Sequence, residues 1–107
     1  MSLRIKQGDA YTVPVRVLAN GSPINIADVE AVEFRIGDVR KLYPGQATYD
    51  GESGEFMVPL TQEDTLAMPE DDAVMFDLRV KFAGGAVIGT QRMTAVPTAD
   101  ALSGEVI

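Results

Sequence analysis

Alternation of apolar and polar positions dominates this chain and predicts β-strands. In the clearest run, residues 73–82, every even position is apolar and the odd positions include Asp77, Arg79 and Lys81. A period of two over this length is typical of a strand with one buried face. Three further runs share the pattern, namely 11–18, 32–36 and 56–60, and weaker candidates cover 3–6, 39–43, 47–49 and 86–96.

Turn residues separate these runs. Asn20-Gly21, Pro44-Gly45 and Gly84-Gly85 suit tight turns between strands. Short strands with a turn about every 8–12 residues favour an all-β sandwich. We therefore expect an immunoglobulin-like antiparallel β-sandwich of about seven or eight strands. Pro14 and Pro59 each lack an amide donor, which predicts an edge strand or a bulge at Pro14 and an edge strand at Pro59.

One segment departs from the alternation and predicts a short helix. Thr61 has the side chain of a helix N-cap, and Asp64 follows three residues later. We expect a crossover helix near residues 62–67 that covers the open end of the sandwich. Residues 1–96 are predicted as a single β-sandwich domain and 97–107 as a C-terminal tail or arm. The predicted core comprises Val13, Val15, Val32, Phe34, Ile36, Phe56, Val58, Phe76, Leu78 and Val80.

Composition narrows the possible chemistry. The chain has 107 residues and contains neither Cys nor His. It therefore lacks disulfides, thiolate metal sites, and the nucleophile–histidine pairs of many hydrolases. No apolar stretch is long enough to cross a membrane, and no secretory signal peptide is expected.

The charge of −7 is unevenly distributed. Residues 42–78 contain nine acidic and no basic side chains, whereas basic residues appear on the first two predicted strands. An acidic chain without a basic run is poorly suited to nucleic acid or to an anionic membrane surface. If the acidic and basic faces lie on different sides, one copy can contact the next head to tail. The candidate interface residues are Arg4, Lys6, Arg16, Asp50, Glu52, Glu55, Glu70, Asp71 and Asp72.

The acidic segments are weak candidates for a metal site. Residues 50–55 offer three carboxylates, but their order does not match an EF-hand loop. A solvated acidic turn is the favoured interpretation there, as it is for the acidic run 70–72. The residues predict no catalytic, cofactor-binding or metal-binding side chains, and hence no enzyme and no cofactor.

The order of several motifs resembles a known class of virion domain. Residues 4–17 read R-I-K-Q-G-D-A-Y-T-V-P-V-R-V, and residues 20–36 read N-G-S-P-I-N-I-A-D-V-E-A-V-E-F-R-I. Residues 54–68 read G-E-F-M-V-P-L-T-Q-E-D-T-L-A-M, and a strand, a glycine turn and a strand close the pattern over residues 74–94. The chain resembles small β-sandwich domains of phage and prophage virion proteins, with the N-terminal domain of phage upper baseplate proteins as the nearest type.

The resemblance implies a non-enzymatic assembly role in a phage-like particle, as a baseplate, tail or capsid accessory or adaptor domain. It implies other virion or tail proteins as partners, and a location in the cytoplasm during assembly and then in the virion. The alternative is an immunoglobulin-like module that binds carbohydrate or protein at a cell surface.

Overall fold

The computed structural model describes residues 5–19, 21–68, 73–89, 94–99 and 105–107. These residues form mainly β-strands, joined by η1 (Ile26–Asp28), a 3₁₀ turn, and α1 (Gln62–Leu66), a short α-helix. The strands are β1 (Ile5–Lys6), β2 (Tyr11–Val15), β3 (Leu18–Ala19), β4 (Ser22–Pro23), β5 (Val29–Ile36), β6 (Val39–Tyr43), β7 (Thr48–Asp50), β8 (Glu55–Leu60), β9 (Ala73–Phe82), β10 (Val87–Gly89) and β11 (Thr94–Ala99).

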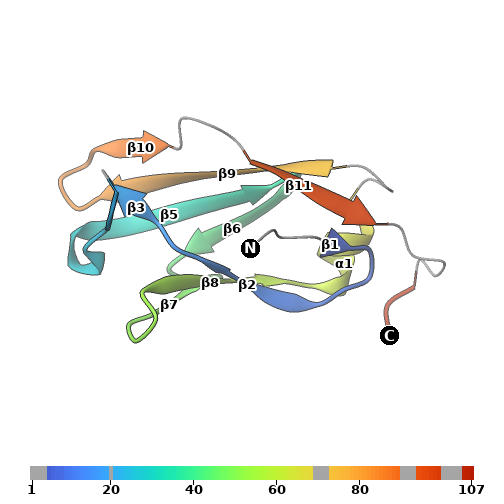
Figure 1. Cartoon of the computed structure of the whole chain (residues 1–107). Coiled ribbons are helices and arrows are strands. Elements are labelled where there is room, and N and C mark those ends of the chain that lie inside the picture. Colours follow the sequence, from blue (N-terminus) through green and yellow to red (C-terminus); the bar gives the residue numbers. More distant parts are fainter. Residues whose placement is uncertain (1–4, 20, 69–72, 90–93, 100–104) are drawn as a thin grey trace.

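Two sheets lie face to face as a sandwich (Figure 1). The six-stranded sheet has the order β1-β11-β9-β5-β6, with β10 also paired to β9, and the three-stranded sheet has the order β2-β8-β7. β3 and β4 form a separate two-stranded ribbon. Every pair is antiparallel except β1 with β11, which is parallel. The predicted all-β sandwich is confirmed.

Strand β9 organises the six-stranded sheet. One of its edges pairs with β5, and the other pairs with β11 at the start of β9 and with β10 near its end. The weak run predicted at 86–96 is therefore two strands that share one edge of β9. Because of such short extra strands, the structure has more strands than the seven or eight expected.

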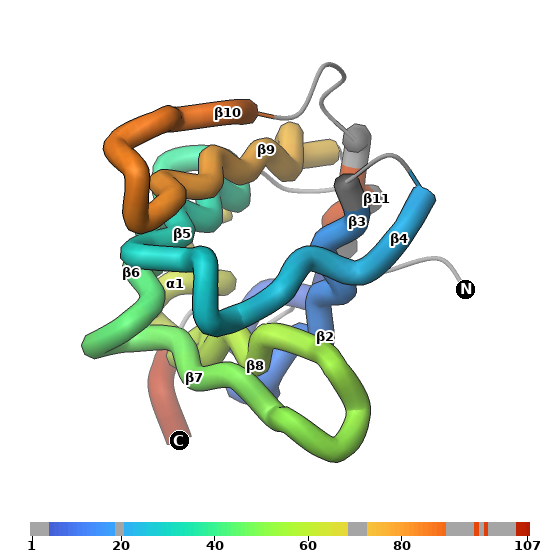
Figure 2. Tube along the Cα trace, turned by 90° about the vertical axis from the view of Figure 1, so that its left-hand side faces the viewer, coloured from blue at the N-terminus to red at the C-terminus, as the bar shows by residue number. Residues whose placement is uncertain are grey.

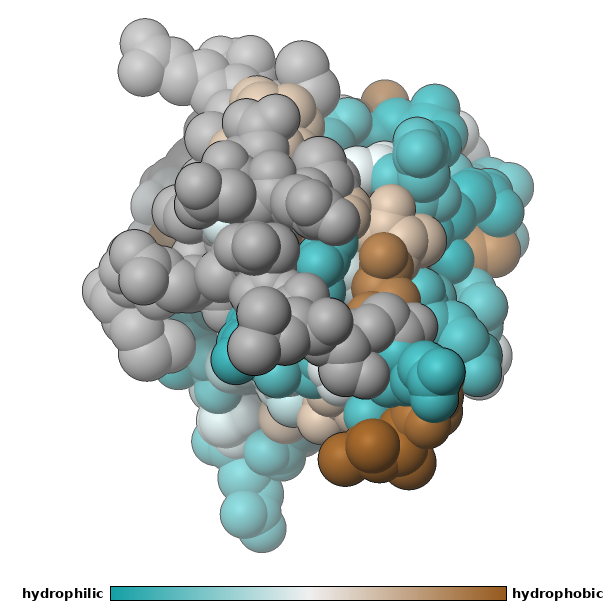
Figure 3. All heavy atoms as spheres, turned by 90° about the vertical axis from the view of Figure 1, so that its right-hand side faces the viewer, coloured by the Kyte–Doolittle hydropathy of each residue, from teal (hydrophilic) through white to brown (hydrophobic). Residues whose placement is uncertain are grey.

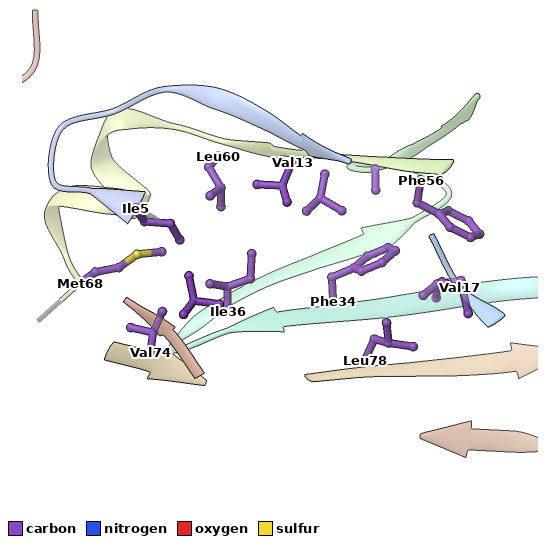
Figure 4. Close-up of a cluster of buried hydrophobic side chains, with 14 of the residues drawn as sticks. Ile5, Val13, Val17, Phe34, Ile36, Phe56, Leu60, Met68, Val74 and Leu78 are labelled. Carbon is purple, nitrogen blue, oxygen red and sulfur yellow. The ribbon is translucent and has the colours of Figure 1, made fainter. Parts of the chain in front are cut away.

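The core lies between the two sheets (Figure 4). Eight of the predicted core residues are buried: Val13, Val32, Phe34, Ile36, Phe56, Val58, Leu78 and Val80. The prediction is wrong for Val15 and Phe76, which are only half-buried and pack against this cluster. Val15 is the last residue of the edge strand β2. Phe76 belongs to the six-stranded sheet, which is wider than the sheet that faces it, so part of its inward row has little cover. Ile5, which is fully buried, was not among the predicted core residues.

The edge prediction is correct for the strand of Pro14 and only locally correct for that of Pro59. Pro14 lies on β2, which is an edge strand as expected. Pro59 lies on β8, the middle strand of its sheet, so the prediction is wrong for the strand as a whole. However, β7 pairs only with the segment Glu55–Met57 of β8. β8 therefore runs past its neighbour and is locally an edge at Pro59, where a missing amide is tolerated.

Helix α1 forms where the sequence predicts it and joins the two ends of the chain. The Thr61 hydroxyl accepts from the Asp64 amide, and the Asp64 carboxylate accepts from the Thr61 amide, which completes a capping box. Gln62 donates to the Gly8 carbonyl at 3.1 Å and accepts from the Ile107 amide at 3.0 Å. This one turn of helix thus anchors both terminal segments at the end of the sandwich.

The predicted tail begins inside a strand. β11 continues to Ala99, and Thr98 is buried where it pairs with Ile5. Beyond it, the described residues 105–107 include the exposed apolar side chains of Val106 and Ile107. Figure 3 views this end of the molecule and shows apolar surface at its lower edge amid hydrophilic residues.

Candidate interaction surface

The structure describes five of the nine predicted interface residues. Arg4 and the acidic run Glu70, Asp71 and Asp72 lie outside the described residues. Of the five that are described, Lys6 is exposed on β1, Arg16 follows β2, and Asp50, Glu52 and Glu55 lie in or beside the turn that joins β7 to β8.

The expected separation of acidic and basic faces is wrong for Arg16. Its guanidinium donates to the Ser53 carbonyl at 3.1 Å, which places it against the acidic β7–β8 turn. The pairing of β2 with β8 explains this placement, because Val15 lies opposite Phe56 at the start of β8. Cross-strand register thus brings together charges that are distant in sequence.

The carboxylate of Asp50 holds the β7–β8 turn in shape by accepting hydrogen bonds from within the turn. Asp50 accepts from the Glu52 amide at 3.0 Å and from the Ser53 hydroxyl at 3.1 Å. The hydrogen bond from Glu52, followed by that from Ser53, keeps the pKa of the Asp50 carboxyl below its usual range. Gly54 completes the turn with a φ of +73°, a conformation that favours glycine. Asp50 is therefore part of the turn's own hydrogen-bond network.

We expect calcium to leave the stability of the protein unchanged. Within the described residues, no three acidic side chains gather in a way that could hold a metal ion. We expect the melting temperature to be the same in millimolar calcium and in excess chelator. A rise of several degrees with calcium would contradict this, because a ligand that binds only the folded state raises stability by mass action.

Among the described residues, a cluster of three charged side chains lies on the outer face of the six-stranded sheet, the face turned away from the core. Alternation along β5 directs Glu33 outward between the buried Val32 and Phe34. Arg79 on β9 lies directly opposite Glu33 and donates to one carboxylate oxygen at 2.6 and 2.9 Å. Arg40 on β6 pairs with the other oxygen. One carboxylate therefore connects three adjacent strands.

The two arginines hold Glu33 in its charged form. The hydrogen bond from Arg40, and then that from Arg79, keep the pKa of Glu33 below its ordinary value. The Glu33 side chain is 13% exposed, whereas the two arginines are more than half exposed. The cluster is thus a structural brace that presents two partly solvated guanidinium groups to the surface.

This pKa shift predicts a dependence of stability on pH. Because folding lowers the pKa of Glu33, its contribution is present above the unfolded pKa of about 4.3 and is lost as the pH falls through the folded value. We expect Glu33→Gln to be less stable than the wild type at neutral pH and to lose less stability on acidification. Urea unfolding at a series of pH values measures both effects. Glu52→Gln, on the exposed turn, is the matched control and should reproduce the wild-type slope; equal slopes for all three proteins would contradict the prediction.

A second ion pair links α1 to the edge of the six-stranded sheet. The Lys41 ammonium on β6 lies 2.9 Å from the Asp64 carboxylate. Partial burial disfavours the charged form of Asp64, but the Thr61 amide and the Lys41 ammonium outweigh this effect and keep its pKa low. Asp64 therefore serves the helix cap and the contact between α1 and β6 together.

A groove of about 660 Å³ runs between these two ion pairs and is open to solvent. Its lining includes Met68, Val74 and Met75 as apolar side chains. The charged residues around it are Glu33, Arg35, Asp38, Asp64, Asp77 and Arg79. Of these, Glu33 is paired with Arg40 and Arg79, and Asp64 is paired with Lys41.

Sequence reasoning did not single out this outer face. Glu33, Arg40 and Arg79 are distant in sequence, and only strand register makes them neighbours. In the sequence, the alternation around Glu33 places it on the outer face, between two inward apolar residues. This pattern indicates the face that Glu33 occupies but not the residues with which it pairs.

No protein-family model, curated protein or solved structure matches the chain. The immunoglobulin-like assignment and the resemblance to virion domains therefore stay predictions. Among the described residues, no helix has the length and apolar character needed to span a bilayer.

Proposed function

We propose that the protein is a non-enzymatic assembly subunit of a phage-like particle, in which it joins other virion or tail proteins. The non-enzymatic part of this proposal is supported by how two carboxylates are held. Glu33 and Asp64, the best-connected acids at the groove, are held ionised by structural partners, and their pKa values are lowered. A general acid at neutral pH needs the opposite shift, toward a raised pKa. Glu33 joins neighbouring strands and Asp64 joins α1 to β6, so both are poor candidates for proton transfer.

The assignment to a phage-like particle rests on the resemblance of the sequence to virion domains. Its most distinctive motif, L-T-Q-E-D-T at residues 60–65, spans the end of β8 and most of α1. Four of its six side chains serve the architecture, since Leu60 and Thr65 are buried and Thr61 and Asp64 cap the helix. A motif whose residues are used in this way suits a structural subunit, and an immunoglobulin-like sandwich is the fold expected of it.

The test is to locate the protein in its own host. After treatment of the source strain with a DNA-damaging agent, released particles are separated on a density gradient and the chain is quantified in each fraction by mass spectrometry. We expect the chain in the particle fractions at a fixed ratio to the major structural proteins. Its presence only in the soluble fraction would contradict the proposal, and its presence on intact cells would favour the surface-binding module.

A further inference from the structure

Strand β10 is an exposed apolar edge of the six-stranded sheet. Among the described residues it pairs with β9 alone. Val87 and Ile88 have exposed fractions of 55% and 61%, among the highest of the large apolar side chains described. An edge strand of this kind offers unpaired backbone groups and apolar side chains to another strand.

The hydrogen-bond pattern shows which backbone groups face outward. The Phe82 amide donates to the Ala86 carbonyl at 2.8 Å, so this pair faces inward across the hairpin. In an antiparallel ladder the direction alternates with each residue. The amide and carbonyl of Ile88 therefore point toward β9, and those of Val87 and Gly89 point toward the open edge.

The side chain of Ile88 lies on the inward side of the sheet but lacks cover. Ile88 is opposite Val80, which is only 4% exposed, so both side chains belong to the inward row. The position of β10 accounts for this exposure (Figures 1 and 2). β10 lies at the top of the sandwich, separated from β7 and β8 of the three-stranded sheet at the bottom.

Three of the other edge strands carry features that discourage strand pairing. β2 contains Pro14, β6 contains Arg40 and Lys41, and β1 ends in Lys6. By contrast, residues 82–91 contain no charged side chain. A charged edge opposes its own copy in antiparallel pairing, whereas an uncharged one does not.

We propose that β10 pairs with β10 of a second copy of this chain around a two-fold axis. With Ile88 opposite Ile88 of the second copy, Val87 lies opposite Gly89 of that copy on each side of the axis. These are the residues whose amides and carbonyls face outward, so four backbone hydrogen bonds follow from the register. The central pair makes no backbone hydrogen bonds across the axis, and in such pairs the side chains approach most closely. Two exposed isoleucines thus cover each other, and the six-stranded sheets become continuous.

The salt dependence of this dimer distinguishes it from a contact driven by opposite charges. Each copy carries a net charge of −7, so two copies repel each other at low ionic strength. Salt screens that repulsion, and the apolar and backbone contacts remain. The β10 dimer is therefore expected to strengthen with salt, whereas head-to-tail contact between acidic and basic surfaces weakens.

Sedimentation equilibrium tests the proposal, with protein from about 10 μM to about 1 mM at about 0.02 and 0.5 M salt. We expect the wild type to form a dimer whose dissociation constant falls as salt is added. Ile88→Lys places two ammonium groups opposite each other and should weaken the dimer at least about tenfold. Met75→Lys adds the same charge at an exposed position on β9 and should leave the dimer unchanged. A wild type that stays monomeric throughout, a dimer that weakens with salt, or equal effects of the two variants would overturn the proposal.

Cross-linking provides a readout that does not depend on weakened association. The chain has no cysteine, so Ile88→Cys introduces the only thiol. Directly opposite residues of this type have a Cα separation suited to a disulfide. Under mild oxidation Ile88→Cys should form a covalent dimer much faster than Met75→Cys, and equal rates would overturn the register. Neither experiment depends on the particle assignment, so the dimer and the proposed function can fail separately.

Discussion

Replacement of Phe56 by alanine should lower the free energy of unfolding by about 3–5 kcal/mol. Phe56 is 1% exposed and is the aromatic centre of the core. Its ring lies 5.0 Å from the rings of Tyr43 and Tyr49 and 5.6 Å from that of Phe34. These neighbours come from three different strands, β5, β6 and β7, so they cannot collapse together into the space left by the ring.

Denaturant unfolding measures this loss, and Phe82→Ala is the matched control. Phe82 is the same residue type, but it lies half-buried at the end of β9 and has solvent on one side. Its truncation removes less buried area and should have a clearly smaller effect. Equal losses for the two variants would mean that Phe56 does not occupy the centre of the core.

Replacement of Thr65 by valine should lower the free energy of unfolding by about 1–3 kcal/mol. Thr65 is fully buried on α1, and its hydroxyl accepts from the Gly8 amide at 2.9 Å and donates to the Asp9 carbonyl at 2.8 Å. Valine has nearly the same shape but no hydroxyl. It therefore leaves a backbone donor and a backbone acceptor without these partners beside the core.

Thr65→Ser separates the hydroxyl from the methyl group. Serine keeps both hydrogen bonds and loses only one buried methyl, worth about 0.8 kcal/mol. We therefore expect serine to be better tolerated than valine when the two are compared by urea unfolding. If valine proves as stable as the wild type, the hydroxyl does not join α1 to the segment that contains Gly8 and Asp9.

Several elements could be predicted from residues near one another in sequence. The alternation over residues 73–82 predicts β9 with its observed bounds and its inward row. The capping pattern of Thr61 and Asp64 predicts α1, because a capping box involves residues only three positions apart. Local steric and hydrogen-bond preferences are sufficient for such features.

Other elements depended on where the opposing sheet lies. Alternation indicates which face of β9 Phe76 occupies, but not that Phe76 remains half-buried there. Likewise, Pro59 could be assigned to an edge, but not to the end of a middle strand beyond its partner. The extent of a neighbouring strand is a non-local property, so the residues around Pro59 do not encode it.

The candidate surface was the least predictable part. Charge counting separated an acidic middle from basic flanks, whereas the fold places Arg16 on the acidic turn and Lys41 on Asp64. The brace of Glu33 with Arg40 and Arg79 exists only because β6, β5 and β9 are neighbours in a particular register.

The sequence by itself determined the all-β class, the turn of helix and most of the inward-facing rows, because periodicity and capping act over a few residues. Only the tertiary structure decided which strands lie side by side, which charges pair and which edge stays open. Those outcomes depend on strand order and on the unequal widths of the two sheets. For that reason the uncharged run near Val87 and Ile88 was predicted only as part of a strand, and its exposed edge became evident in the fold.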